Sequence, residues 1–101
     1  MNDPLARQRA MVAQHPENEL ARFSLGKALY DRGDWAGARE HLQVALSKRA
    51  DWMVVQILLG KIELQTGNRE GARAAFLAAR QLAIDQHHEG PLAELDELLS
   101  G

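Results

Sequence analysis

The sequence repeats itself with a period of 34 residues. When residues 19–52 are aligned with residues 53–86, nine of the 34 positions carry the same residue in both copies. These identical pairs are Leu25/Leu59, Gly26/Gly60, Lys27/Lys61, Gly33/Gly67, Gly37/Gly71, Ala38/Ala72, Arg39/Arg73, Ala45/Ala79 and Asp51/Asp85. A repeat of this length is a supersecondary unit that does not bury its own apolar face and has to stack on its neighbours. The period therefore indicates an array of similar units rather than a single irregular core.

Each copy predicts two amphipathic helices joined by a short turn. We expect the first helix at about 19–31 and about 52–65, and the second at about 35–48 and about 69–84, because apolar residues recur there with the spacing of one helix face. The turns are marked by Gly33-Asp34 and Gly67-Asn68. Glycine ends a helix in the left-handed conformation, and Asp or Asn caps the next helix. The sequence therefore predicts two helical hairpins.

Two glycines fall in the middle of the first helices, where glycine costs about 1 kcal/mol relative to alanine. These are Gly26 and Gly60, and they occupy the same position in both copies. We interpret them as points of close approach between the two helices of a hairpin, with Ala38 and Ala72 as their counterparts on the second helix.

Two repeats are fewer than the three that a stable array usually needs. We expect the segments on either side of the repeats to form helices that cover the exposed apolar faces of the two hairpins. Asp3-Pro4 is a typical helix start, with proline at the first helical position, and the helix is expected to end before Pro16. Gly90-Pro91 opens a second flanking helix. Its apolar face is formed by Leu92, Leu95, Leu98 and Leu99.

We therefore expect one domain over residues 1–101 with six helices. It consists of an N-terminal helix and loop, two repeats and a capping helix, at residues 1–18, 19–52, 53–86 and 87–101.

This pattern resembles the tetratricopeptide repeat over residues 19–86, about two thirds of the chain. The matching residues are Leu25, Gly26, Gly33, Asp34, Trp35, Ala38, Leu42 and Ala45, then Leu59, Gly60, Gly67, Asn68, Ala72, Phe76 and Ala79. The resemblance implies an all-α fold, a right-handed α-solenoid of two hairpins with an N-terminal helix and a C-terminal capping helix. It also implies an adaptor or scaffold that binds other proteins.

In that family the first helix of each hairpin lines a concave groove. The matching residues, which we call the groove stripe, are Leu20, Phe23, Lys27, Tyr30, Val54, Ile57, Lys61 and Leu64. A second stripe on the same helices is available for the hairpin core and consists of Ala21, Leu25, Ala28, Val55, Leu59 and Ile62. An apolar strip with two lysines suits an amphipathic peptide or partner helix that carries acidic residues.

Two other interpretations of the groove stripe stay open. The stripe can be part of the core, covered by the terminal helices, with Lys27 and Lys61 reaching solvent without a ligand. It can also be a homodimer interface, which would make the protein a self-assembling structural module. A third binding mode does not fit: positions matching the lysine and asparagines that hold a chaperone's terminal carboxylate are Phe23, Lys27 and Leu58 here.

Composition and motifs argue against several other classes of function. Twelve basic and fourteen acidic residues give a net charge of −2, which provides no footprint for nucleic acid or an anionic membrane. The absence of cysteine excludes disulfides, zinc thiolate sites and thiol catalysis. No metalloprotease, hydrolase or phosphate-loop motif is present, and the acidic face around Glu94 and Asp96 is expected to be solvated. We expect a soluble, cytoplasmic protein that is not an enzyme, with no catalytic residues, metal or cofactor.

Overall fold

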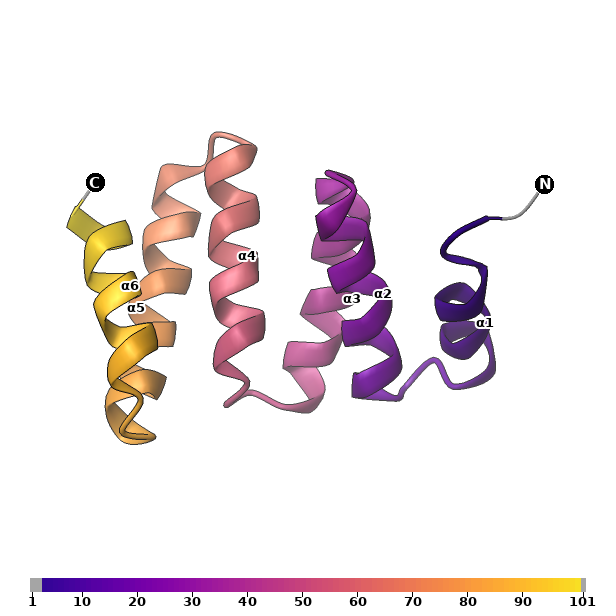
Figure 1. The fold of residues 1–101 in the computed structure, drawn as a ribbon, viewed down its shortest axis with the longest axis horizontal. Helices are drawn as coiled ribbons and strands as arrows, with labels where there is room; N and C mark the ends of the chain where they lie inside the picture. The colour runs from indigo at the N-terminus through magenta and orange to yellow at the C-terminus, as the bar shows by residue number, and fades with distance from the viewer. Residues whose placement is uncertain (1–2, 101) are drawn as a thin grey trace. The chain divides into compact units, whose positions relative to one another are not determined.

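The computed structural model describes residues 3–100. Within that range the chain forms six α-helices and no strand (Figure 1). The helices are α1 (Ala6–Gln14), α2 (Glu19–Asp31), α3 (Trp35–Lys48), α4 (Met53–Gln65), α5 (Arg69–Asp85) and α6 (Glu89–Ser100). The predicted all-α fold class is confirmed, and this succession of helices is compatible with a helical solenoid.

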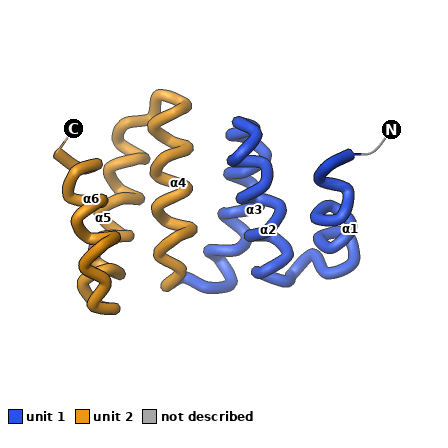
Figure 2. The backbone as a smooth tube through the Cα atoms, viewed as in Figure 1, with its two compact units in different colours: residues 1–50 blue, residues 51–101 orange. Residues whose placement is uncertain are grey.

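The chain divides into two compact units, residues 1–50 and residues 51–101 (Figure 2). In the first unit, α2 packs against both α1 and α3. In the second unit, α5 packs against both α4 and α6. Each unit therefore contains one predicted hairpin and one flanking helix. The single domain over residues 1–101 stays a prediction, and its residues 1, 2 and 101 lie outside the described range.

Three predicted helix starts are displaced by one or two residues. α1 begins at Ala6, so Pro4 lies in the preceding turn and not at the first helical position. The Asp3 carboxylate accepts a hydrogen bond from the Leu5 backbone N–H at 2.9 Å, and this local turn delays the helix. α4 begins at Met53 after an extended Trp52, and α6 begins at Glu89.

The two glycine turns have the predicted left-handed backbone, with φ of 77° at Gly33 and 84° at Gly67. In each turn the amide of the next residue reaches back to a helix carbonyl. Asp34 N–H donates to Leu29 O at 3.0 Å, and Asn68 N–H donates to Glu63 O at 2.8 Å. These bonds satisfy carbonyl groups that the helix end would otherwise leave unpaired.

The same two residues then cap the following helices. The Asp34 side chain accepts from Gly37 N–H at 3.0 Å, and the Asn68 side chain accepts from Gly71 N–H at 2.9 Å. One polar side chain after each glycine therefore begins the second helix of its hairpin, as the sequence predicts.

The turn between α5 and α6 has the same geometry without a glycine. His87 has a φ of 58°, and His88 N–H donates to Ala83 O at 2.9 Å. A side chain in the left-handed region is strained because its Cβ crowds the following carbonyl oxygen. This turn is therefore the one helix end within residues 3–100 where a non-glycine residue takes the positive φ.

The close approach at the mid-helix glycines is present in both hairpins. A Cβ on Gly26 would lie 2.8 Å from Leu42 Cγ, and a Cβ on Gly60 would lie 2.6 Å from Phe76 Cδ1. The expectation that Ala38 and Ala72 are the counterparts is wrong. A missing Cβ leaves room for a large side chain, and Leu42 and Phe76 fill that room from one turn further along the second helix.

The second unit has a continuous apolar core built around Phe76. The buried members of this core are Met53, Ile57, Ala72, Phe76, Ala79, Ala83 and Leu95. The remaining leucines of the predicted capping face, Leu92, Leu98 and Leu99, pack against it. The C-terminal helix thus covers the second hairpin with the face that the sequence predicts.

The left-handed turns give a paired stability prediction. His87→Gly should raise the free energy of unfolding by about 0.5–1 kcal/mol, because glycine removes the strain at positive φ. Gly67→Ala should lower it by about the same amount. No side chain lies within 4 Å of a Cβ built on Gly67, so the effect there reports the backbone alone. Urea denaturation measures both, and a destabilised His87→Gly protein would contradict the assignment.

The glycine contact in the second hairpin gives another prediction. Gly60→Ala gains about 1 kcal/mol of helix propensity but forces the buried Phe76 ring to move, and overpacking costs about 1–3 kcal/mol. We expect a net loss of about 1 kcal/mol. In a Phe76→Leu protein, Gly60→Ala should lower the free energy of unfolding by less. If the two substitutions changed this free energy strictly additively, the contact between Gly60 and Phe76 would be contradicted.

Candidate functional site

The two stripes on α2 and α4 differ in exposure. In the second stripe Ala21, Leu25, Val55, Leu59 and Ile62 are buried and Ala28 is half-buried. In the groove stripe three large apolar side chains are exposed, with Leu20 at 59%, Val54 at 48% and Leu64 at 44%. Ile57 of the groove stripe is buried. The other members are half-buried, and they are Phe23, Lys27, Tyr30 and Lys61.

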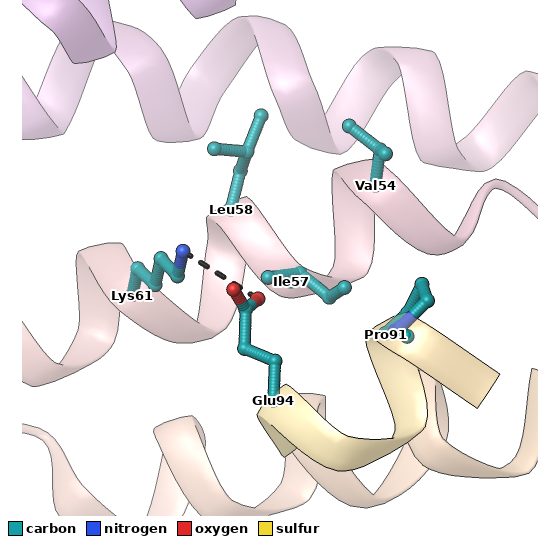
Figure 3. A pocket seen from close by; sticks show the side chains of 7 residues that line it. Val54, Ile57, Leu58, Lys61, Pro91 and Glu94 are labelled. Carbon is teal, nitrogen blue, oxygen red and sulfur yellow. Dashed lines mark ion pairs between the residues drawn. The ribbon is translucent and has the colours of Figure 1, made fainter. Parts of the chain in front are cut away.

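In the second unit, part of the groove stripe forms one side of a hollow between α4 and the first turns of α6 (Figure 3). The hollow has a volume of about 340 Å³. Its lining residues are Val54, Ile57, Leu58, Lys61, Gly90, Pro91 and Glu94. We call it the α4–α6 hollow. Leu64, at the end of the stripe, lies outside this lining.

The polar contact of this hollow is an ion pair between the two helices. Lys61 Nζ lies 3.7 Å from Glu94 Oε1, and both side chains are partly exposed (Figure 3). Exposed pairs of this kind contribute about 0–1 kcal/mol, because water screens the charges and side-chain entropy opposes the fixed geometry. The lysine is therefore paired, but only weakly held.

In the first unit the other groove-stripe lysine is paired within its own helix. Lys27 Nζ donates to both carboxylate oxygens of Asp31, at 2.7 and 3.0 Å. The ammonium lies 6.0 Å from the centre of the Tyr30 ring, and that ring meets Trp35 edge-on at 5.4 Å. Both groove-stripe lysines thus already face a carboxylate from this chain.

Sequence reasoning does not place Leu58, Gly90, Pro91 or Glu94 at this site, and it treats Glu94 as part of a solvated acidic face. The structure separates that face around the buried Leu95: Glu94 pairs with Lys61 on α4, and Asp96 pairs with Arg80 on α5 at 2.7 Å. One feature of the sequence could have indicated this separation: Glu94 and Asp96 lie on either side of Leu95, which belongs to the apolar face of the helix.

A second polar contact joins the helices of the first hairpin. Arg22 donates from Nε to Pro16 O at 2.8 Å, and its Nη1 lies 3.0 Å from His41 Nδ1. Arginine has no acceptor atom, so the imidazole accepts and is neutral in this arrangement. The corresponding residues of the second repeat are Gln56 and Ala75, and an alanine side chain cannot form this hydrogen bond.

Burial is the main cause that lowers the pKa of His41. Arg22 and Arg9 lower this pKa further, whereas Glu40 and Asp34 raise it. Because the folded protein binds this proton less readily than the unfolded chain, the neutral histidine contributes stability that is complete above pH 6.5. That contribution is lost as the pH falls through the lowered pKa of the folded state.

The pH dependence of unfolding tests this contact. Between pH 7.5 and pH 5.5 the free energy of unfolding should fall more steeply in the natural protein than in His41→Ala, which carries the residue of the second repeat. Urea denaturation across that range measures the difference. Equal losses in both proteins would contradict a depressed pKa at His41. Glu17, whose pKa is lowered by its hydrogen bond to Lys48, acts only at more acidic pH.

Within residues 3–100, no group of three or more histidine, aspartate or glutamate side chains is arranged to hold a metal ion. No helix in the described part of the chain has the length and apolar character needed to cross a membrane.

Comparison with known proteins relates the chain to bacterial relatives. No protein-family model matches this sequence. The chain is 39% identical over 66 residues to TPR repeat-containing protein PA0015 of Pseudomonas aeruginosa, which is 65% of this chain. The match spans 63% of the length of that relative. The fold is similar to the solution structure of protein BPP2914 from Bordetella parapertussis, with a TM-score of 0.83 and 32% identity. That similarity covers 99% of this chain and 87% of the other.

Proposed function

We propose a specific peptide-binding role for this chain, which belongs to the tetratricopeptide-repeat-like proteins. The predicted resemblance to that family is confirmed by the relative whose name carries the repeat. The family is in general a non-enzymatic protein-interaction fold, and membership supports a protein-interaction module with protein partners.

The groove stripe binds an amphipathic segment that carries acidic residues. The observation that carries this proposal is the α4–α6 hollow, where the exposed Val54 and the paired Lys61 line one apolar depression. Glu94 supplies a carboxylate to Lys61 in the free protein. A partner's carboxylate replaces it there, while apolar side chains of the partner cover Val54 and its neighbours.

The energetics favour such an exchange. The Lys61–Glu94 pair is exposed, so separating it costs at most about 1 kcal/mol. Covering apolar surface contributes about 25 cal/mol per Å², and this is the main source of affinity in a helix-in-groove complex. The lysines then select the sign of the partner's charge more than they determine its affinity.

Selection from a random peptide library tests the proposal, because it lets the groove choose its own ligand. The natural protein should enrich amphipathic peptides with acidic residues. A Lys27→Glu/Lys61→Glu protein should lose that charge preference and bind the enriched peptides several-fold more weakly. Lys48→Glu is the matched control, because Lys48 is the lysine outside the groove stripe. Equal retention of acidic peptides by all three proteins would contradict the assignment.

Light scattering over a concentration series separates this function from self-assembly, in which the groove stripe forms a homodimer interface. A concentration-independent monomer mass supports peptide binding. If the natural protein is a dimer and Leu20→Asp/Val54→Asp makes it a monomer, the groove stripe is instead the interface with a second copy of the chain.

A further inference from the structure

A second hollow lies in the same unit, at the ends of α4 and α6 and the beginning of α5. Its volume is about 460 Å³. It is lined by Leu64, Gly67, Arg69, Ala72, Arg73, Phe76, Leu98 and Leu99. We call it the arginine hollow. It shares Leu64 with the groove stripe but no residue with the α4–α6 hollow.

The internal repeat shows which side chains occupy the equivalent place in the first unit. The residues 34 positions before Leu64 and Arg69 are Tyr30 and Trp35, whose rings meet edge-on at 5.4 Å. A Cβ built on Gly33 would lie 3.9 Å from the Trp35 ring, whereas a Cβ built on Gly67 would meet nothing within 4 Å. The space that an aromatic ring adjoins in the first unit is open in the second.

The charge of the arginine hollow is positive. Arg69 and Arg73 are four residues apart in the first turns of α5, so they project from one face of the helix. Both are exposed, and within residues 3–100 neither guanidinium has an ion pair or a side-chain hydrogen bond. The beginning of α5 adds the positive end of a helix dipole. Carboxylates are the groups that this combination favours.

We propose that the arginine hollow docks an aromatic side chain of a partner peptide whose neighbouring residues are acidic. The ring occupies the open space beside Gly67 and packs against Leu98 and Leu99 of α6, which are half-buried. The flanking carboxylates pair with Arg69 and Arg73, for which the planar guanidinium offers two parallel donors. An aliphatic anchor would leave unused the stacking that the exposed arginines offer to a ring.

Titration of the ¹⁵N-labelled full chain with the capped peptide Gly-Asp-Trp-Glu-Gly tests this proposal. Amide shifts should concentrate at residues lining the arginine hollow. Arg69→Glu and Arg73→Glu should each weaken binding about ten-fold or more, a loss of about 1.4 kcal/mol per ten-fold step. Peptides with Asn and Gln in place of the acids, or Ala in place of Trp, should bind at least ten-fold more weakly.

A filling variant tests the open space as well as the charge, and Arg69→Gln is its control because it removes the same charge without filling the hollow. Leu64→Tyr/Arg69→Trp installs the two aromatic side chains of the first repeat, and it should abolish binding while the melting temperature is kept or raised. Arg73→Glu, an exposed substitution, guards against a filling variant that does not fold.

Lys48→Glu is the control, because Lys48 lines neither hollow, and it should leave the affinity unchanged. Amide shifts at the arginine hollow and not at the α4–α6 hollow separate this site from the groove function. Equal binding by Arg73→Glu and the natural protein, or shifts confined to the α4–α6 hollow, would overturn the proposal. Failure of the acidic preference at the groove stripe, with these results intact, would overturn only the groove function.

Discussion

The seating of one large side chain against a mid-helix glycine is the interaction on which each hairpin depends. Leu42 sits over Gly26, and Phe76 sits over Gly60, with exposed fractions of 0% and 2%. Each glycine costs its helix about 1 kcal/mol. Full burial of a leucine or phenylalanine contributes about 1.5–3 kcal/mol, so the exchange is favourable. The contact also fixes the rotation of α2 and α4 about their axes. Once one face of each helix is committed to the hairpin, the groove stripe is the other face, and in the second unit its Ile57 is already buried in the core.

Local chemistry explains why so much of this fold is predictable from sequence. The glycine turns and their Asp34 and Asn68 caps involve residues at most five positions apart, so the sequence contains every partner. The start of α1 is displaced because the Asp3 side chain competes for the first free N–H, a choice that helix-start statistics for proline do not reveal. The counterparts of the glycines could not be predicted from identity between the repeats alone. Ala38 and Ala72 are identical in both copies, whereas the residues that fill the hole, Leu42 and Phe76, differ in shape.

The candidate site was predictable only in part, because it depends on packing between segments distant in sequence. Helical periodicity located Val54, Ile57 and Lys61 on one face of α4. It gave no information about which residues of α6 would lie against that face. The position of Leu95 in the core decides this: the residues on either side of it diverge, so Glu94 reaches α4 and Asp96 reaches α5. Two acids that look equivalent in the sequence therefore make different ion pairs. Glu94 pairs with Lys61, one of the two lysines of the groove stripe.

The differences between the repeats are as informative as their identities. Residues that both repeats share, such as Gly33 and Gly67, form the turns. Residues that differ between the repeats determine which side chains of each unit contact one another. In the first unit Tyr30 contacts Trp35, and Arg22 contacts His41. At the matching positions the second unit has Leu64 with Arg69, and Gln56 with Ala75. The second unit has no aromatic pair at these positions, and it has an open space beside Gly67 with a cation at its edge. The two units therefore share the scaffold of the hairpin but differ in which side chains these positions pair and which they leave exposed.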